Sequence, residues 1–224
     1  MKQLDGIRAI IFDLDDTLYE EANYYQSGFK AAANLLSVAN VGSFESNFDL
    51  LKSLHAVERD FVFDRAQQKL AFHETLIPSL IEAFYTAQLS LSFYPGVEKT
   101  LLLLRERFRL GIITDGHAEI QKKKISALSA HDYFDHILIT DEYGRSFWKP
   151  NTAAFKLACD TLQVNASESV FVGDNPTRDI AGANTSGLYS IRIRHPGSYF
   201  STQPNNEFLP KQEITCIEEI LDFF

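Results

Sequence analysis

The chain has 224 residues, of which 45% are hydrophobic and 23% charged, and its formal net charge is −9. A chain of this size and composition can bury a core without disulfides, either as one large domain or as a domain with an insertion. The negative charge argues against a nucleic acid polymer or an anionic membrane surface as the main partner.

Cysteine content and hydropathy indicate where the protein resides. Cys159 and Cys216 cannot form a disulfide framework, which favours a reducing cytoplasm. The apolar run near the amino terminus is too short for a signal peptide. No apolar stretch approaches the roughly 20 residues of a membrane span. We therefore expect a soluble cytoplasmic protein.

The first predicted element is a strand over residues 7–12, an apolar run that ends in Asp13, Asp15 and Asp16. Its isoleucine-rich composition is typical of a buried strand in a parallel sheet. We expect the carboxylates at the C-terminal edge of that sheet, where open α/β sheets bind ligands. Three carboxylates within four residues repel one another, which indicates a bound cation, most simply a metal that prefers oxygen ligands.

The segment that follows shows helical periodicity and no clear strand pattern as far as residue 92. Apolar residues recur at helical spacing over residues 21–39, 48–61, 64–72 and 78–89. Residues 41–47 are predicted to form a break, and Pro78 suits the first turn of the last helix. Because this block of helices lies between two segments that contain predicted strands, it indicates an inserted α-helical subdomain.

From residue 94 onward, predicted strands alternate with predicted helices. Strands are expected over residues 109–116, 136–144, 169–176 and 188–194, with a short last strand over 213–216. Helices are expected over residues 97–108, 118–128, 152–164, 177–187 and 217–224, and a loop over 195–210. This alternation implies right-handed βαβ units and a mostly parallel sheet.

Polar side chains recur where the predicted strands end. They are Asp13, Asp15 and Thr17, then Thr114 and Asp115, then Asp141 and Glu142, and finally Asp174. In a parallel sheet all of these ends lie at one edge. Asp and Thr are also favoured at helix N-caps and in turns, so Asp115, Asp141 and Glu142 have that structural role as an open alternative.

Four motifs of the sequence, three of them at these strand ends, resemble those of the haloacid dehalogenase-like hydrolases, a family dominated by phosphatases. FDLDDT, which begins at Phe12, resembles the family's first motif, DxDx[TV]. ITDG, Lys149 in WKP, and GDNPTRD match the later motifs in order, so that the resemblance extends from Ile7 to about Asp179.

The resemblance implies an α/β fold with a Rossmann-like parallel sheet in strand order 3-2-1-4-5. Residues 1–18 and 93–224 would form this core. Residues 19–92 would form an α-helical cap of the C1 type, which closes over the site, excludes water and selects the substrate.

The resemblance also implies catalytic roles. Asp13 would attack phosphorus to give an aspartyl-phosphate. Asp15 would protonate the leaving alcohol and then deprotonate the attacking water. Lys149 would balance the charge between the nucleophile and the phosphate. Thr17 would brace the loop, and Asp16 would be a loop residue without a chemical role.

Two sets of ligand-binding residues follow from the same resemblance. The phosphate would be contacted by Leu14, Asp15, Thr114, Asp115 and Lys149. Mg²⁺ would be bound by Asp13, by the main-chain carbonyl of Asp15, by Asp174 and, through a water, by Asp179. For Asp179, a helix-start carboxylate that complements the helix dipole is an open alternative.

The sequence therefore predicts a Mg²⁺-dependent phosphomonoesterase that acts on a small phosphorylated metabolite, such as a sugar phosphate or a nucleotide. A dehalogenase of this family would need neither Asp15 nor Asp174, and a phosphomutase would share every motif. A non-catalytic binding relative would lack the nucleophile or a metal ligand, and neither is missing. Tyr19, Glu20 and Tyr24 are candidate contacts for the leaving group.

Overall fold

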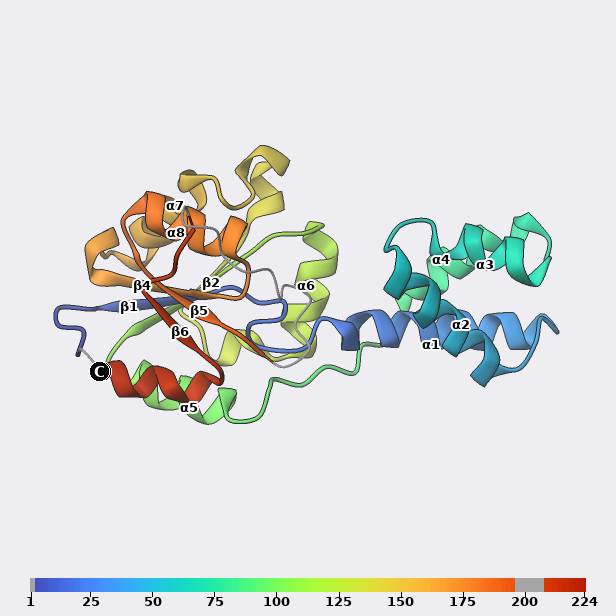
Figure 1. Ribbon diagram of the computed structural model, residues 1–224, viewed down its shortest axis with the longest axis horizontal. Coiled ribbons are helices and arrows are strands. Elements are labelled where there is room, and N and C mark those ends of the chain that lie inside the picture. The colour runs from blue at the N-terminus through green and yellow to red at the C-terminus, as the bar shows by residue number, and fades with distance from the viewer. Residues whose placement is uncertain (1–2, 196–207) are drawn as a thin grey trace. The chain divides into compact units, whose positions relative to one another are not determined.

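The computed structural model describes residues 3–195 and 208–224 (Figure 1). The chain divides into two compact units, one formed by Met1–Glu20 with Ser92–Phe224 and the other by Glu21–Leu91. We call the first the core unit and the second the helical unit. Within the described residues, no helix has both the length and the apolar character that a membrane crossing requires.

The core unit contains one six-stranded sheet in which every neighbouring pair of strands is parallel. Its strands are β1 (Ala9–Phe12), β2 (Arg109–Thr114), β3 (His136–Ile139), β4 (Ser169–Gly173), β5 (Tyr189–Ile193) and β6 (Gln212–Ile214). The order β3-β2-β1-β4-β5-β6 confirms the predicted α/β sheet and its order 3-2-1-4-5, and it adds β6 at the edge.

Strand β1 lies in the middle of the sheet, between β2 and β4. Ala9 is in register with Arg109 on one side and Ser169 on the other. All four residues of β1 are completely buried, which explains its uninterrupted apolar sequence. The ladder continues one residue past the strand, because the Asp13 amide donates to the Val172 carbonyl at 2.8 Å.

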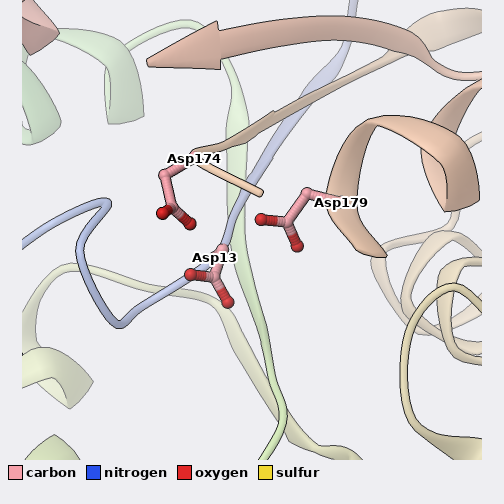
Figure 2. A group of neighbouring side chains, drawn as sticks. All are labelled: Asp13, Asp174 and Asp179. Atoms are coloured by element: carbon pink, nitrogen blue, oxygen red, sulfur yellow. The ribbon is translucent and has the colours of Figure 1, made fainter. Parts of the chain in front are cut away.

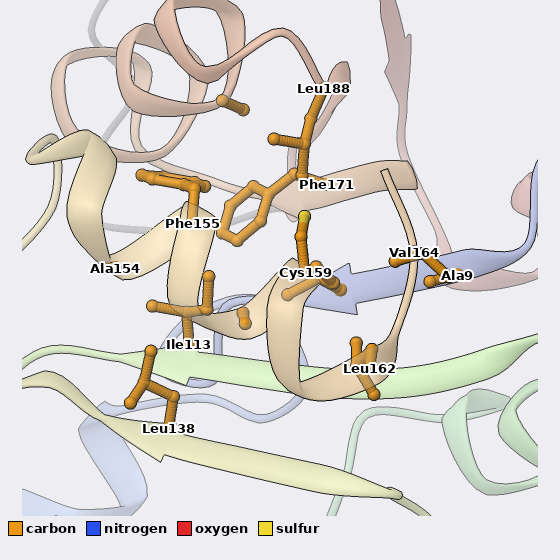
Figure 3. Close-up of a cluster of buried hydrophobic side chains, with 13 residues drawn as sticks. Ala9, Ile113, Leu138, Ala154, Phe155, Cys159, Leu162, Val164, Phe171 and Leu188 are labelled. Atoms are coloured by element: carbon orange, nitrogen blue, oxygen red, sulfur yellow. The ribbon is translucent and has the colours of Figure 1, made fainter. Parts of the chain in front are cut away.

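Helices cover both faces of this sheet. They are α5 (Val97–Arg105), α6 (Ala118–Ala127), α7 (Thr152–Leu162) and α8 (Ala181–Ser186). Figure 1 shows α7 and α8 over one face, and α5 with the 3-10 helix Ile217–Phe223 over the other. Between α7 and the strands lies a cluster of buried apolar side chains, in which the Phe155 and Phe171 rings meet edge to face at 5.0 Å (Figure 3).

Some predicted elements of the core unit differ in extent or type from the structure, and one cannot be compared. Strand β3 ends at Ile139, and residues Thr140–Tyr143 form a 3-10 helix. The predicted helix over 177–187 is a π-helix over Pro176–Ile180 followed by the short α8. The predicted loop over 195–210 lies mostly outside the described residues.

The helical unit consists of α1 (Ala22–Val38), α2 (Phe44–Val57), α3 (Val62–Leu70) and α4 (Ile77–Thr86), with a 3-10 helix at Glu74–Leu76. Aromatic side chains form its core, where Phe29, Phe63 and Phe84 contact one another. Pro78 lies in the first turn of α4, as predicted.

The predicted break over residues 41–47 is wrong in its second half, because α2 already begins at Phe44. The Ser43 hydroxyl accepts a hydrogen bond from the Ser46 amide at 3.2 Å and so caps the helix. This cap satisfies one of the free amides of the first turn and allows the helix to start four residues before its apolar periodicity becomes clear.

Candidate active site

Three neighbouring strands bring polar side chains together at one edge of the sheet. Asp13 follows β1, Thr114 ends β2 and Asp174 follows β4. All three are buried, with exposed fractions of 6%, 0% and 3%. Because β2, β1 and β4 are adjacent and parallel, the topology alone places these residues side by side.

Asp179 joins Asp13 and Asp174 to form a buried carboxylate cluster (Figure 2). One oxygen from each of the three side chains lies within 4.8 Å of the others. Asp179 belongs to the π-helix Pro176–Ile180, and its Oδ2 accepts a hydrogen bond from the Asn175 amide at 3.0 Å. A Cβ atom on Gly173 would lie 2.5 Å from Asp179 Oδ2, so glycine is required there for the close approach.

The electrostatics of the cluster favour a bound cation. Burial, with smaller contributions from the charges of Asp179 and Asp13, raises the pKa of Asp174 to about 9. Burial also raises the pKa of Asp13 well above its usual value, against the opposing effect of Lys149. The Asp174 Oδ2 atom is buried and has no hydrogen-bond partner among the described residues. A hard divalent cation with oxygen ligands, such as Mg²⁺, fits this set of donors.

Lys149 provides a positive charge beside two of these carboxylates. Its Nζ forms an ion pair with Asp13 Oδ1 and lies 2.8 Å from Asp179 Oδ1. Burial alone would lower the pKa of Lys149, but the charges of Asp13 and Asp179 outweigh it and raise the pKa. The lysine is therefore a permanent cation beside the proposed nucleophile.

Asp15 points to a different set of partners. Its Oδ1 accepts hydrogen bonds from Lys124 Nζ at 2.7 Å and from the Tyr19 hydroxyl, and its Oδ2 accepts one from Gln121 Nε2 at 3.0 Å. Burial raises the pKa of Asp15, but the charge of Lys124 and these hydrogen bonds produce a net lowering. These donors therefore favour the ionised form of the carboxylate.

Thr17 and Thr114 present hydroxyl groups to the site. Thr17 Oγ1 donates to Asp13 Oδ2 at 3.2 Å, consistent with the predicted bracing of the loop. The Thr114 Oγ1 is buried and has no hydrogen-bond partner within the described part of the chain. A phosphoryl oxygen would provide one.

The acid of Asp115 connects two loops. Its Oδ1 accepts hydrogen bonds from Thr140 Oγ1 at 2.8 Å and from the Lys149 amide at 3.1 Å. The side chain thus fixes the loop that carries Lys149. A phosphate contact by Asp115 would come from its main-chain amide.

The acids after β3 have structural roles. Asp141 accepts hydrogen bonds from the Ala118 amide at the start of α6 and from Trp148 Nε1. Glu142 forms a 3.0 Å ion pair with Lys122. For Asp141 the structure therefore shows the capping role that the sequence left as an open alternative.

Sequence reasoning missed Gln121 and Lys124. The run QKKK was interpreted only as part of a helix, and lysines in such a run ordinarily lie on a solvated face. A signal was present, because Gln121, Lys124 and Ile125 have the i, i+3, i+4 spacing of one helix face. All three are buried.

Comparisons with known proteins support the family resemblance of the sequence motifs. A family model described as haloacid dehalogenase-like hydrolase matches residues 10–193. The chain is 32% identical to a glyceraldehyde 3-phosphate phosphatase from Methanopyrus kandleri over 96% of each sequence. It is 33% identical to a ribulose-1,5-bisphosphate 5-phosphatase from Halopiger xanaduensis, over 82% of this chain and 83% of the relative. A solved 2-haloacid dehalogenase from Pseudomonas syringae matches with a TM-score of 0.63 and 27% identity, over 97% of each chain.

Proposed function

Since the chain belongs to the haloacid dehalogenase-like hydrolases, we propose that it is a Mg²⁺-dependent phosphatase of small phosphorylated metabolites that uses Asp13 as its nucleophile. The observation that carries the proposal is the pairing of buried Asp13 with Lys149, beside an Asp15 held by hydrogen-bond donors. A nucleophile, a cation and a proton carrier are the groups that phosphomonoester hydrolysis requires.

The substrate class that we propose is a sugar phosphate of three to five carbons. The relatives from Methanopyrus kandleri and Halopiger xanaduensis are named for the hydrolysis of glyceraldehyde 3-phosphate and ribulose 1,5-bisphosphate. Glyceraldehyde 3-phosphate is the first substrate to test, because that relative aligns over nearly the whole of both chains.

In the first step, an Asp13 oxygen attacks phosphorus as the bond from phosphorus to the leaving oxygen breaks. The protonated form of Asp15, which the second step of each cycle regenerates, gives its proton to that oxygen, so that the product leaves as an alcohol. In the second step, water attacks the aspartyl-phosphate, Asp15 accepts the proton of the water, and inorganic phosphate leaves. The donors to Asp15 in this structure favour its ionised form, which is the form that accepts the proton in the second step.

Lys149 and the loop after β2 would hold the phosphoryl group. The Lys149 ammonium offsets the repulsion between Asp13 and an approaching phosphate. The Thr114 hydroxyl and the amides of Leu14, Asp15 and Asp115 would donate to the phosphoryl oxygens. The transferred group would then lie between the nucleophile and fixed donors.

Mg²⁺ would be held by the carboxylates of Asp13 and Asp174 and by the main-chain carbonyl of Asp15. Asp179 would contact it through a water. When bound, the ion would offset negative charge on the phosphoryl group and on the nucleophile.

The helical unit is proposed to select the substrate, as the predicted cap over residues 19–92. Glu20 and Tyr24 remain candidate contacts for the leaving group. Tyr19 instead donates its hydroxyl to Asp15 in this structure, which gives it a role in the core unit.

Dehalogenation is the second candidate, because the matched structure from Pseudomonas syringae is named a 2-haloacid dehalogenase. It would use the same nucleophile but has no need of the acid at Asp15 or of Asp174. A phosphomutase would share both residues and would require a bisphosphate activator.

The test is hydrolysis by the purified chain of glyceraldehyde 3-phosphate, ribulose 1,5-bisphosphate and p-nitrophenyl phosphate, with Mg²⁺ or with EDTA. We expect phosphate release that EDTA abolishes, Mg²⁺ restores and Asp13→Asn eliminates. Asp5→Asn, at an exposed aspartate, is the matched control. Phosphate release that survives Asp13→Asn or EDTA would refute the mechanism, and chloride release from 2-chloropropionate without phosphatase activity would favour the dehalogenase.

A further inference from the structure

Lys124 is a buried charge for which the mechanism above has no use. Its side chain is only 3% exposed, and its Nζ lies 2.7 Å from Asp15 Oδ1. The two preceding lysines of α6, Lys122 and Lys123, are exposed. An ammonium group buried without a partner loses several kcal/mol of hydration, so the pairing with Asp15 explains why this lysine can face inward.

Gln121 lies one helical turn before Lys124 and reaches the same carboxylate. Its Nε2 donates to Asp15 Oδ2 at 3.0 Å and also to the Asp115 carbonyl at 2.8 Å. One helix face therefore connects the side chain of Asp15 with the loop after β2. All of these residues belong to the core unit, so the arrangement is internal to it.

The loop after β2 is shaped to admit the Gln121 amide. Gly116 has a φ of +122°, which residues other than glycine rarely adopt. A Cβ atom at that position would lie 2.5 Å from Gln121 Nε2. The motif glycine thus makes room for a donor to Asp15.

The three hydrogen-bond donors leave the Asp15 carboxylate one acceptor site at which it can carry a proton. A carboxylate has about four acceptor sites, two on each oxygen. Lys124 and Tyr19 both donate to Oδ1, and Gln121 donates to Oδ2. The acceptor site that remains, counting donors from the described residues, is on Oδ2.

From this geometry we propose that Lys124 and Gln121 are positioning residues that orient Asp15, so that Oδ2 carries the transferred proton. The inference rests on the proposed phosphatase function. In the first step the proton passes from Oδ2 to the leaving oxygen, and Lys124 remains paired with the carboxylate that results. In the second step an O–H bond of water breaks and its proton returns to Oδ2.

Orientation matters because a proton transfer requires the donor within hydrogen-bond reach of the leaving oxygen. A free aspartate rotates about two side-chain bonds, and only some of its rotamers direct Oδ2 to that oxygen. Two donors from one rigid helix restrict this rotation. A displacement of about 1 Å can reduce a rate about a hundredfold.

The experiment compares two phosphate esters that differ in their need for an acid. Glyceraldehyde 3-phosphate releases an alkoxide unless its oxygen is protonated, whereas p-nitrophenyl phosphate releases a stable phenolate. The measured quantity is kcat/KM, which covers only the steps up to the aspartyl-phosphate. Lys124→Met keeps most of the unbranched chain and removes the charge, and Gln121→Leu removes the amide donor. Lys122→Met is the control on the exposed face of α6.

For Lys124→Met and Gln121→Leu we expect kcat/KM for glyceraldehyde 3-phosphate to fall by about 10- to 100-fold. For p-nitrophenyl phosphate it should fall by no more than roughly threefold. The inhibition constant of vanadate should stay unchanged, because Asp13, Lys149 and Thr114 are intact. Lys122→Met should resemble the wild type with both esters.

An equal loss with both esters in both variants would overturn the proposal, because a general distortion of the site would produce it. The proposal would also be overturned if neither variant changed the ratio of the kcat/KM values for the two esters. A wild-type chain that hydrolyses no phosphate ester would instead refute the proposed function. Gln121→Leu keeps the test decisive if Lys124→Met does not fold, since it leaves the buried charge pair in place.

Discussion

The ammonium of Lys149 lies 2.8 Å from Asp179 Oδ1, and both side chains are almost completely buried. The same ammonium pairs with Asp13, so one cation faces two of the three clustered carboxylates. The lysine is therefore a counter-ion of the whole cluster in addition to its proposed role toward the phosphate.

Replacing this cation should affect both activity and stability. For Lys149→Met without metal, we expect the free energy of unfolding to fall by about 3–5 kcal/mol, because two buried carboxylates lose their partner. Phosphatase activity should fall by at least about a hundredfold, the scale found when one group that stabilises transition-state charge is removed. Urea denaturation and phosphate release measure the two effects. Lys156→Met removes an exposed lysine of α7 and should change neither.

Substitution of Asp15 should separate binding from chemistry. Asp15→Asn keeps the size of the side chain but cannot carry the proton, so turnover of an alkyl phosphate should fall by about 10²- to 10⁴-fold. Inhibition by vanadate should persist, because the phosphate contacts are retained. Steady-state kinetics with the alkyl phosphate and vanadate would check both expectations. An unchanged kcat would show that Asp15 is not the proton carrier.

A methyl group on Gly173 should disturb the carboxylate cluster through Asp179. Gly173→Ala places a Cβ atom 2.5 Å from Asp179 Oδ2, so we expect weaker Mg²⁺ binding, seen as a smaller rise of Tm on Mg²⁺ addition. Asp179→Gly removes the carboxylate and also the Asp179 Cβ atom, which would lie 2.7 Å from the new methyl group, so it should relieve the clash. The two changes together should then destabilise the protein by less than their sum. Strictly additive losses in this double-mutant cycle would exclude a clash with Asp179 as the cause.

His55 should make the stability of the helical unit dependent on pH. Its ring lies 4.1 Å from that of Tyr25, and burial, with the charges of Arg59 and Arg65, lowers the pKa of His55 to about 4. The unfolded chain then binds a proton more readily than the folded chain does. Stability should therefore be complete above pH 6.5 and fall as the pH decreases toward 4, by up to about 1.4 kcal/mol per pH unit.

The corresponding variant is His55→Phe, which keeps an aromatic ring and removes the titrating group. Urea denaturation followed by circular dichroism should show a smaller slope of stability against pH between 4 and 6.5. Above pH 7 the two proteins should have the same pH dependence. Equal slopes below pH 6.5 would mean that His55 takes up its proton as easily in the folded chain as in the unfolded one.

The central part of the fold was predictable because it depends on local sequence and on topology. The apolar run of β1 predicted a buried parallel strand, and Asp13 had to follow it at the edge of the sheet. Strand β4 ends in the same way before Asp174. The right-handed rule for crossovers then leaves few ways to arrange the strands.

Other features were not predictable because they depend on packing between distant residues. Which lysine of α6 faces inward is decided by the rotation of that helix against Asp15, a residue 109 positions away in the sequence. The start of α2 depends on one hydroxyl cap at Ser43, which a search for apolar periodicity overlooks. The π-helix that carries Asp179 has only five residues, which is too short for a hydrophobic period to identify it.

The central position of β1 also affects the order in which the protein can fold. Its partners are β2, in register at Arg109, and β4, in register at Ser169. The ribosome must therefore release the chain as far as β4 before β1 is paired on both sides. The helical unit is formed by the continuous segment of residues 21–91, so it can form earlier during synthesis. Until β4 arrives, β1 keeps one unpaired apolar edge, the kind of surface that chaperones bind and that aggregation begins from. Among the cluster residues, Asp13 is made first, and it cannot meet Asp174 and Asp179 until the chain has been synthesised beyond residue 179.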